Sequence, residues 1–106
     1  MEVSMNDLRE LVGATKLADD AFPMTTGEKY LIRTVTMYYT GEVVSISSFG
    51  IKLTKAAWIA DTGRFSEALR NGEFNEVEPY INDVVVAKGC IVDFTKWSHD
   101  LPQKQK

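Results

Sequence analysis

The stretch 38–64 concentrates the side chains of this sequence that are best suited to holding a ligand. Its aromatic rings can stack on flat ring systems such as nucleobases, and the arginine and lysines beside them can meet phosphate oxygens. A helix that begins near the end of the stretch would add free backbone N–H groups for an anion. The ligand-binding residues that we predict are therefore Tyr38, Tyr39, Lys52, Lys55, Trp58, Asp61, Thr62 and Arg64.

Each of these residues also has a purely structural interpretation. Trp58 fits a barrel core or a subunit interface, and Arg64 can pair with Glu67 along a helix. Asp61 and Thr62 are adequately explained as helix caps. The binding interpretation depends on their crowding within one short stretch.

Charge is unevenly distributed around this stretch, although the whole chain carries a net charge of −3. Residues 31–70 hold five basic and three acidic side chains, a balance of 5 − 3 = +2. Residues 1–30 give 3 − 6 = −3, and residues 71–93 give 1 − 5 = −4. The pattern is either ordinary surface variation or a local anion site within an acidic protein, which as a whole is not suited to DNA.

The sequence lacks the signatures of common catalytic sites. It has no P-loop, no dinucleotide-binding glycine motif, no nucleophile elbow and no paired-histidine zinc motif. The single histidine, His99, is expected to be a solvated tail residue, and the single cysteine, Cys90, a buried structural thiol. We therefore predict a non-enzymatic protein with no cofactor and no metal.

The order of patterns along the chain predicts three parts. Residues 1–28 read as a short helix over "SMNDLRELVG" followed by an arm that contains Pro23 and Gly27. Residues 29–98 read as a small β-barrel domain, and residues 99–106 as a polar tail that frays. The start of the sequence has no signal-peptide pattern and no apolar run reaches membrane-spanning length, so we expect a cytoplasmic protein that does not contact membranes.

The predicted barrel is built from five strands and one short helix. Apolar and β-branched alternation predicts strands over 29–39, 42–47 and 51–59, with Gly41 as a bulge or bend. A helix follows within "ADTGRFSEALRNG", then an acidic connection over 73–83 and two short strands over 84–88 and 90–95. On the third strand, Ile51, Leu53, Ala57 and Ile59 are assigned to the core face. The fold class is therefore mainly β, as a closed five-stranded barrel of the Sm-like or SH3-like type.

Two family resemblances accompany this layout. The segment "YYTGEVVSISSFGIKL" resembles the first motif of Sm-like barrels, without the acidic residue that usually precedes the third strand. The residues Arg33-Thr34, Gly41, Trp58-Ile59 and "FSEAL" are similar to a pattern in a family of small uncharacterised phage and prophage proteins. That second resemblance implies a phage origin and the cytoplasm of a bacterial host.

By analogy with small phage proteins that sequester nucleotide signals, the resemblance implies an oligomeric, non-catalytic sponge for a nucleotide-type signal of host antiviral defence. Two alternatives stay open. The acidic segment "GEFNEVEPYIND" is typical of a surface that inhibits or adapts a host protein, and an Sm-like ring would bind RNA. A homo-oligomer is expected because so small a barrel leaves edges and apolar surface for a symmetric partner to cover.

Overall fold

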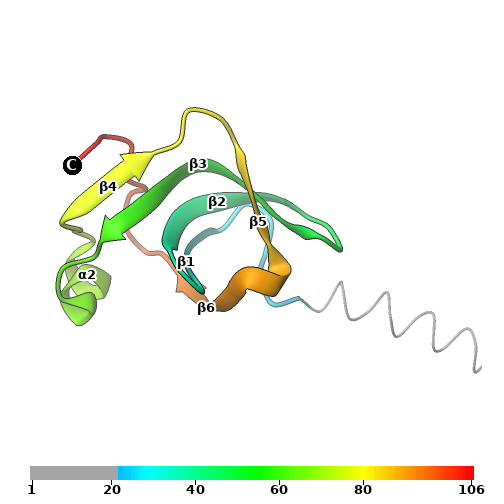
Figure 1. Ribbon diagram of the computed structural model, residues 1–106, viewed down its shortest axis with the longest axis horizontal. Coiled ribbons are helices and arrows are strands. Elements are labelled where there is room, and N and C mark those ends of the chain that lie inside the picture. The colour runs from blue at the N-terminus through cyan, green and yellow to red at the C-terminus, as the bar shows by residue number, and fades with distance from the viewer. Residues whose placement is uncertain (1–21) are drawn as a thin grey trace, which may run out of the picture.

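The computed structural model describes residues 22–106, which form a six-stranded antiparallel sheet, one α-helix and one 3₁₀ turn (Figure 1). The helix predicted near the N-terminus lies outside the described residues. In chain order the elements are β1 (Lys29–Thr34), β2 (Tyr38–Ile46), β3 (Gly50–Asp61), α2 (Phe65–Asn71), β4 (Glu76–Pro79), β5 (Val84–Ala87), η1 (Lys88–Cys90) and β6 (Ile91–Lys96). The prediction of a mainly β fold is confirmed over these residues.

The first predicted strand is in fact a β-hairpin. The chain reverses after Thr34 and enters β2 at Tyr38. The Thr34 hydroxyl donates to the backbone oxygen of Met37 at 2.8 Å and accepts from its backbone N–H at 3.0 Å. A threonine side chain thus closes this turn. It takes the place of the glycine, proline or asparagine that normally marks a reversal in a sequence.

A β-bulge in β3 determines which side chains reach the core. Lys55 has φ +53°, and Lys55 with Ala56 lies opposite the single residue Gly41 on β2. The extra residue shifts the alternation, so Leu53 and Ala56 share one core cluster while Ala57 belongs to another. All four residues of β3 that the sequence assigns to the core are buried, but Ala57 and Ile59 lie in the second cluster, so the prediction of one core face along β3 is wrong beyond Lys55. The irregularity predicted at Gly41 is present, but the extra residue lies in β3, and Gly41 is the residue of β2 that faces it.

The sheet is open and six-stranded, which corrects the expectation of a closed five-stranded barrel. Its strands run in the order β4-β3-β2-β1-β6, and β5 pairs with the first part of β3. The additional strand is β4, which lies in the acidic connection and pairs with the second part of β3. Because β3 is twelve residues long, two short strands share its outer edge.

Two hydrophobic clusters occupy opposite faces of this sheet. Successive residues of β1 supply both, since Ile32 belongs to the first cluster and Leu31 to the second. The first lies where the sheet curls around Val43, Ile51 and Leu53, all almost fully buried. The second lies beneath α2, whose one buried residue is Ala68. The helix therefore covers one face of the sheet near β3 and β4.

The C-terminal segment is anchored along its length, unlike the frayed tail that the sequence predicts. Trp97 stacks on Phe74 with ring centroids 5.1 Å apart, and the His99 ring packs edge-on against Trp97. Lys106 exchanges two backbone hydrogen bonds with Val77 of β4. The tail thus covers the outer edge of β4 and ties the helix end to the sheet.

Gly72 makes this packing possible. It ends α2 with φ +76°, a left-handed conformation that favours glycine. A Cβ atom there would lie 2.5 Å from Cγ of His99. The His99 ring also lies 2.8 Å, measured from Nε2, from the backbone oxygen of Leu69, so the absence of a side chain lets the tail approach the last turn of the helix.

Candidate ligand-binding groove

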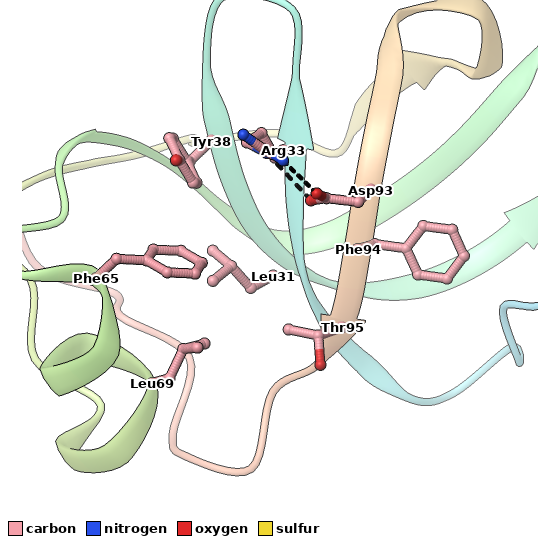
Figure 2. Close-up of a pocket in the computed structure, with 8 residues that line it drawn as sticks. All are labelled: Leu31, Arg33, Tyr38, Phe65, Leu69, Asp93, Phe94 and Thr95. Atoms are coloured by element: carbon pink, nitrogen blue, oxygen red, sulfur yellow. Dashed lines mark hydrogen bonds and ion pairs between the residues drawn. The ribbon is translucent and has the colours of Figure 1, made fainter.

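A groove of about 340 Å³ lies between α2 and the neighbouring strands β1 and β6 (Figure 2). Leu31 forms its floor, while the helix contributes Phe65 and Leu69 one turn apart. Phe65 is 43% exposed and Leu69 is 39% exposed, so the helix turns two large apolar side chains towards solvent. A space of this size falls within the range of small-molecule sites in proteins.

Two aromatic rings flank the groove. Tyr38, the first residue of β2, lies with its ring centroid 5.9 Å from that of Phe65, at an interplanar angle of 51°. Figure 2 shows the two rings beside Leu31, whereas the Phe94 ring points away from them, towards the opposite face of the sheet. The rings and leucines together give a flat ligand an apolar surface with two π faces.

An ion pair stands at one end of the groove. The Arg33 guanidinium donates from Nε to Oδ1 of Asp93 at 3.2 Å and from Nη2 to Oδ2 at 2.5 Å, in a bidentate arrangement between β1 and β6. These two bonds use two of the five N–H groups of a guanidinium, which leaves donors for a ligand. The pair offers donors and acceptors side by side, as recognition of the polar edge of a heterocycle requires.

The ion pair sets a pH dependence of stability. The hydrogen bond from Arg33 lowers the pKa of Asp93, and the same bond raises the pKa of Arg33. Because the pKa of Asp93 is lower in the folded chain than in the unfolded chain, its contribution is complete above about pH 4 and is lost as the pH falls through the folded value. Both side chains are well exposed, so we expect a small effect.

We expect Asp93→Asn to flatten the acid limb of the stability profile. The difference in urea midpoint between wild type and variant should be larger at pH 6 than at pH 3. Asp83→Asn, which removes an exposed carboxylate from the loop between β4 and β5, serves as the control and should leave the acid limb unchanged. A difference for Asp93→Asn that is equal at both pH values would contradict the assignment.

The eight residues predicted to bind a ligand do not form one site. Tyr38 lines the groove, but Tyr39 is on the opposite face of the sheet, because neighbouring residues of a strand point in opposite directions. Lys52 is exposed on β3 between Ser45 of β2 and Val85 of β5, away from the groove. Lys55 occupies the bulge, where its backbone oxygen accepts a hydrogen bond from Gln103.

The Asp61–Arg64 turn differs from the predicted cap and anion site. Arg64 itself is the N-cap of α2 and has no side-chain cap. The Asp61 carboxylate accepts the Gly63 N–H at 2.8 Å, and the Thr62 hydroxyl donates to the Gly63 backbone oxygen. The Gly63 N–H is therefore already bonded to a carboxylate and is not free to bind an anion. In addition, α2 is short, with only seven residues. Arg64 directly precedes Phe65 in the chain but is not one of the residues that line the groove.

Trp58 lies on the face opposite the groove, with Tyr39 and Tyr80. It pairs directly with Tyr39 across β2 and β3, and it is 38% exposed. The Tyr39 and Tyr80 rings stack with centroids 6.2 Å apart. The pKa of Tyr39 is raised, mainly by burial and to a smaller extent by the neighbouring Tyr80. The structure therefore separates the predicted aromatic residues into two surfaces.

The groove contains several residues that are not among the eight predicted to bind a ligand: Leu31, Arg33, Phe65, Leu69, Asp93, Phe94 and Thr95. The apolar pair Phe65 and Leu69 carried a signal, since residues four apart share one helix face. Asp93 and Arg33 carried none, because they are 60 residues apart and meet only through the pairing of β1 with β6.

Two further predictions concerned single residues of possible reactivity. Cys90 is exposed, at the end of η1, and not a buried thiol as the sequence predicts. His99 contacts Trp97 and the end of α2 and is not a freely solvated side chain. Within residues 22–106 no group of His, Cys, Asp and Glu side chains is arranged to hold a metal ion, and no helix in that range is long and apolar enough to cross a membrane.

No protein-family model, curated protein or solved structure matches this chain. The groove and the aromatic surface are therefore interpreted from their own chemistry.

Proposed function

We propose that this protein is a non-catalytic binding protein whose groove holds a nucleotide-type ligand. The observation that carries the proposal is the junction of the Tyr38 and Phe65 rings with the Arg33–Asp93 pair. The rings can stack on a base, and the pair can hydrogen-bond to the polar edge of the ligand. Arg64, next to Phe65 in the chain, is the residue that we assign to a phosphate group.

The biological role that we attach to this site is sequestration of a nucleotide signal in the host cytoplasm, as a phage-encoded sponge. It rests on the sequence resemblance to small phage proteins. A sponge binds its ligand without consuming it, which suits a groove built from aromatic rings, leucines and one neutralised ion pair. A sponge that binds this way would release the intact nucleotide when it is denatured.

The strand order relates this open sheet to SH3-like barrels. Five strands follow the path β5-β3-β2-β1-β6, and η1 connects β5 directly to β6. This path around one core cluster has the strand order of an SH3-like barrel that stays open between β5 and β6, with β4 and α2 as an insertion after β3. Within the described residues, β6 pairs only with β1, so a second copy at this edge is the basis of our proposal of a homo-oligomer.

The protein-inhibitor alternative has less support from the structure. Its surface, the acidic segment 72–83, contains β4, which is bonded to β3 on one side and to Lys106 on the other. Little backbone is therefore left in β4 for a partner strand. The RNA-binding alternative requires a continuous basic surface, whereas the net charge is −3.

The proposal is tested by measuring the binding of cyclic dinucleotides and of ADP-ribose-type nucleotides by calorimetry and thermal shift. We expect Phe65→Ala to weaken the binding by about fivefold to a hundredfold, the range for loss of one base-stacking partner. Phe49→Ala is the matched control, because Phe49 is an exposed phenylalanine in the turn between β2 and β3. The bound nucleotide should be recovered unchanged after heat denaturation.

Three results would overturn the proposal. The first is the absence of any thermal shift across the nucleotide panel together with no nucleotide in the denatured protein. The second is equal weakening of binding by Phe65→Ala and Phe49→Ala. The third is conversion of the nucleotide during incubation, which would show catalysis in place of sequestration.

A further inference from the structure

The face of the sheet opposite the groove carries a second aromatic surface with a different charge. It consists of Tyr39 on β2, Trp58 on β3, Glu78 on β4 and Tyr80 directly after β4. Trp58 pairs with Tyr39 on one side and with Glu78 on the other, so these three side chains form a row across three adjacent strands. Directly opposed residues have Cβ atoms about 5 Å apart and project from the same face.

Tyr80 joins the row because the backbone after β4 stays bonded to β3. The Tyr80 N–H donates to the backbone oxygen of Ala56 at 2.9 Å. Ala56 is two residues before Trp58, on the same side of β3, and is buried in the first core cluster. The Tyr39 and Tyr80 rings stack on each other, with centroids 6.2 Å apart and an interplanar angle of 29°.

Both the exposure and the charge of this surface favour a cation. Trp58 is 38% exposed and Tyr80 is 39% exposed, so two electron-rich rings face solvent. Glu78 lies beside Trp58, where its carboxylate accepts a hydrogen bond from the neutral Gln105 side chain at 3.3 Å. The stretch 71–87, which contains β4, has four acidic residues and no lysine or arginine, although Lys106 lies against Val77 of β4 through two backbone hydrogen bonds.

Burial raises the pKa of Tyr39, which favours the neutral form of that ring. Neutral rings attract cations through the negative potential of their faces, and Trp is the strongest of the aromatic side chains in this respect. An anionic nucleotide would instead meet the carboxylate of Glu78. The two aromatic surfaces of the protein are therefore suited to ligands of opposite charge.

We propose that Tyr39, Trp58, Tyr80 and Glu78 form a second site, which binds a methylated ammonium group. Such a group is large and weakly hydrated, so the cost of removing its water is low and exposed aromatic rings can contact it. It occurs both in free quaternary amines and in methylated lysine side chains. The site is independent of the nucleotide groove, which lies across the sheet.

The test uses tetramethylammonium as the probe, at constant ionic strength, with tryptophan fluorescence and two-dimensional NMR as readouts. Trp58 is the responsive fluorophore because Trp97 is buried. We expect saturable changes at Tyr39, Trp58 and Tyr80, and weakening of about fivefold or more in Trp58→Leu. Glu78→Gln keeps the size and shape of the side chain, so it should weaken binding of the cation without affecting the fold.

A neutral compound of the same shape separates cation binding from hydrophobic contact. Choline should bind more tightly than 3,3-dimethylbutan-1-ol, which replaces the charged nitrogen with carbon. Equal binding of these two compounds, or unchanged affinity in Glu78→Gln, would overturn the proposal. So would concentration-dependent self-association that Trp58→Leu abolishes, since this face would then be an interface between copies.

Choline and a short uncharged peptide that carries trimethyl-lysine distinguish the two sources of the group. Tighter binding of choline assigns the site to free quaternary amines, and tighter binding of the peptide assigns it to methylated protein. Phe65→Ala should leave both affinities unchanged, which keeps the result independent of the nucleotide groove. Loss of cation binding in Phe65→Ala would contradict two separate sites.

Discussion

Trp97→Ala is expected to lower the free energy of unfolding by about 3–5 kcal/mol, the range for truncation of a buried aromatic side chain. Trp97 is 3% exposed and stacks on Phe74 beneath α2. Its indole Nε1 donates to the backbone oxygen of Asp100 at 3.1 Å, so the substitution also removes a hydrogen bond that positions the C-terminal segment. The loss combines a cavity under the helix with release of the tail.

Urea unfolding followed by circular dichroism measures this change without relying on the fluorescence of the residue that is removed. Phe49→Ala is the control, because an exposed aromatic side chain away from the core should cost about 0.5 kcal/mol or less. If Trp97→Ala does not fold, His99→Ala tests the same packing more mildly, through loss of the contact with Trp97. A cost below about 1 kcal/mol for Trp97→Ala would contradict the role of the tail in the core.

Leu53→Ala is expected to destabilise the protein by about 2–5 kcal/mol. Leu53 is fully buried in the first core cluster, with an exposed fraction of 0%. Gly41 on the adjacent strand packs directly against it, since a Cβ atom on Gly41 would lie 3.0 Å from Cβ and 3.1 Å from Cδ1 of Leu53. We therefore expect Gly41→Ala alone to cost about 1–3 kcal/mol by overpacking.

The double variant tests whether these two effects arise from one contact. Truncation of Leu53 removes Cγ and Cδ1 but keeps Cβ, so the methyl group introduced by Gly41→Ala loses two of its three close contacts and fills part of the cavity. The cost of Gly41→Ala with Leu53→Ala should be smaller than the sum of the single costs, because residues in contact are not additive. Strict additivity in urea unfolding would show that Gly41 is required for another reason, such as the conformation of the bulge.

Local signals correctly predicted several elements of the fold. Periodicity and β-branched residues indicated strands within 29–39, 42–47, 51–59, 84–88 and 90–95, and the glycine after "FSEALRN" marked the end of α2. These signals are local, because strand alternation and helix termination depend on neighbouring residues. The turn after Thr34 escaped prediction because a side-chain hydroxyl replaces the usual turn residues.

The sequence alone determined that this chain forms a β-rich domain with aromatic and basic side chains concentrated in 38–64 and an acidic stretch after them. Only the tertiary structure decided how those side chains are shared between sites. Alternation along β2 sends Tyr38 to the groove and Tyr39 to the opposite face, and the bulge at Lys55 changes which residues of β3 accompany them. Arg33 meets Asp93, and Trp58 meets Glu78, through strand pairings between distant segments. Strand register is a property of the whole sheet, so no local pattern contains it.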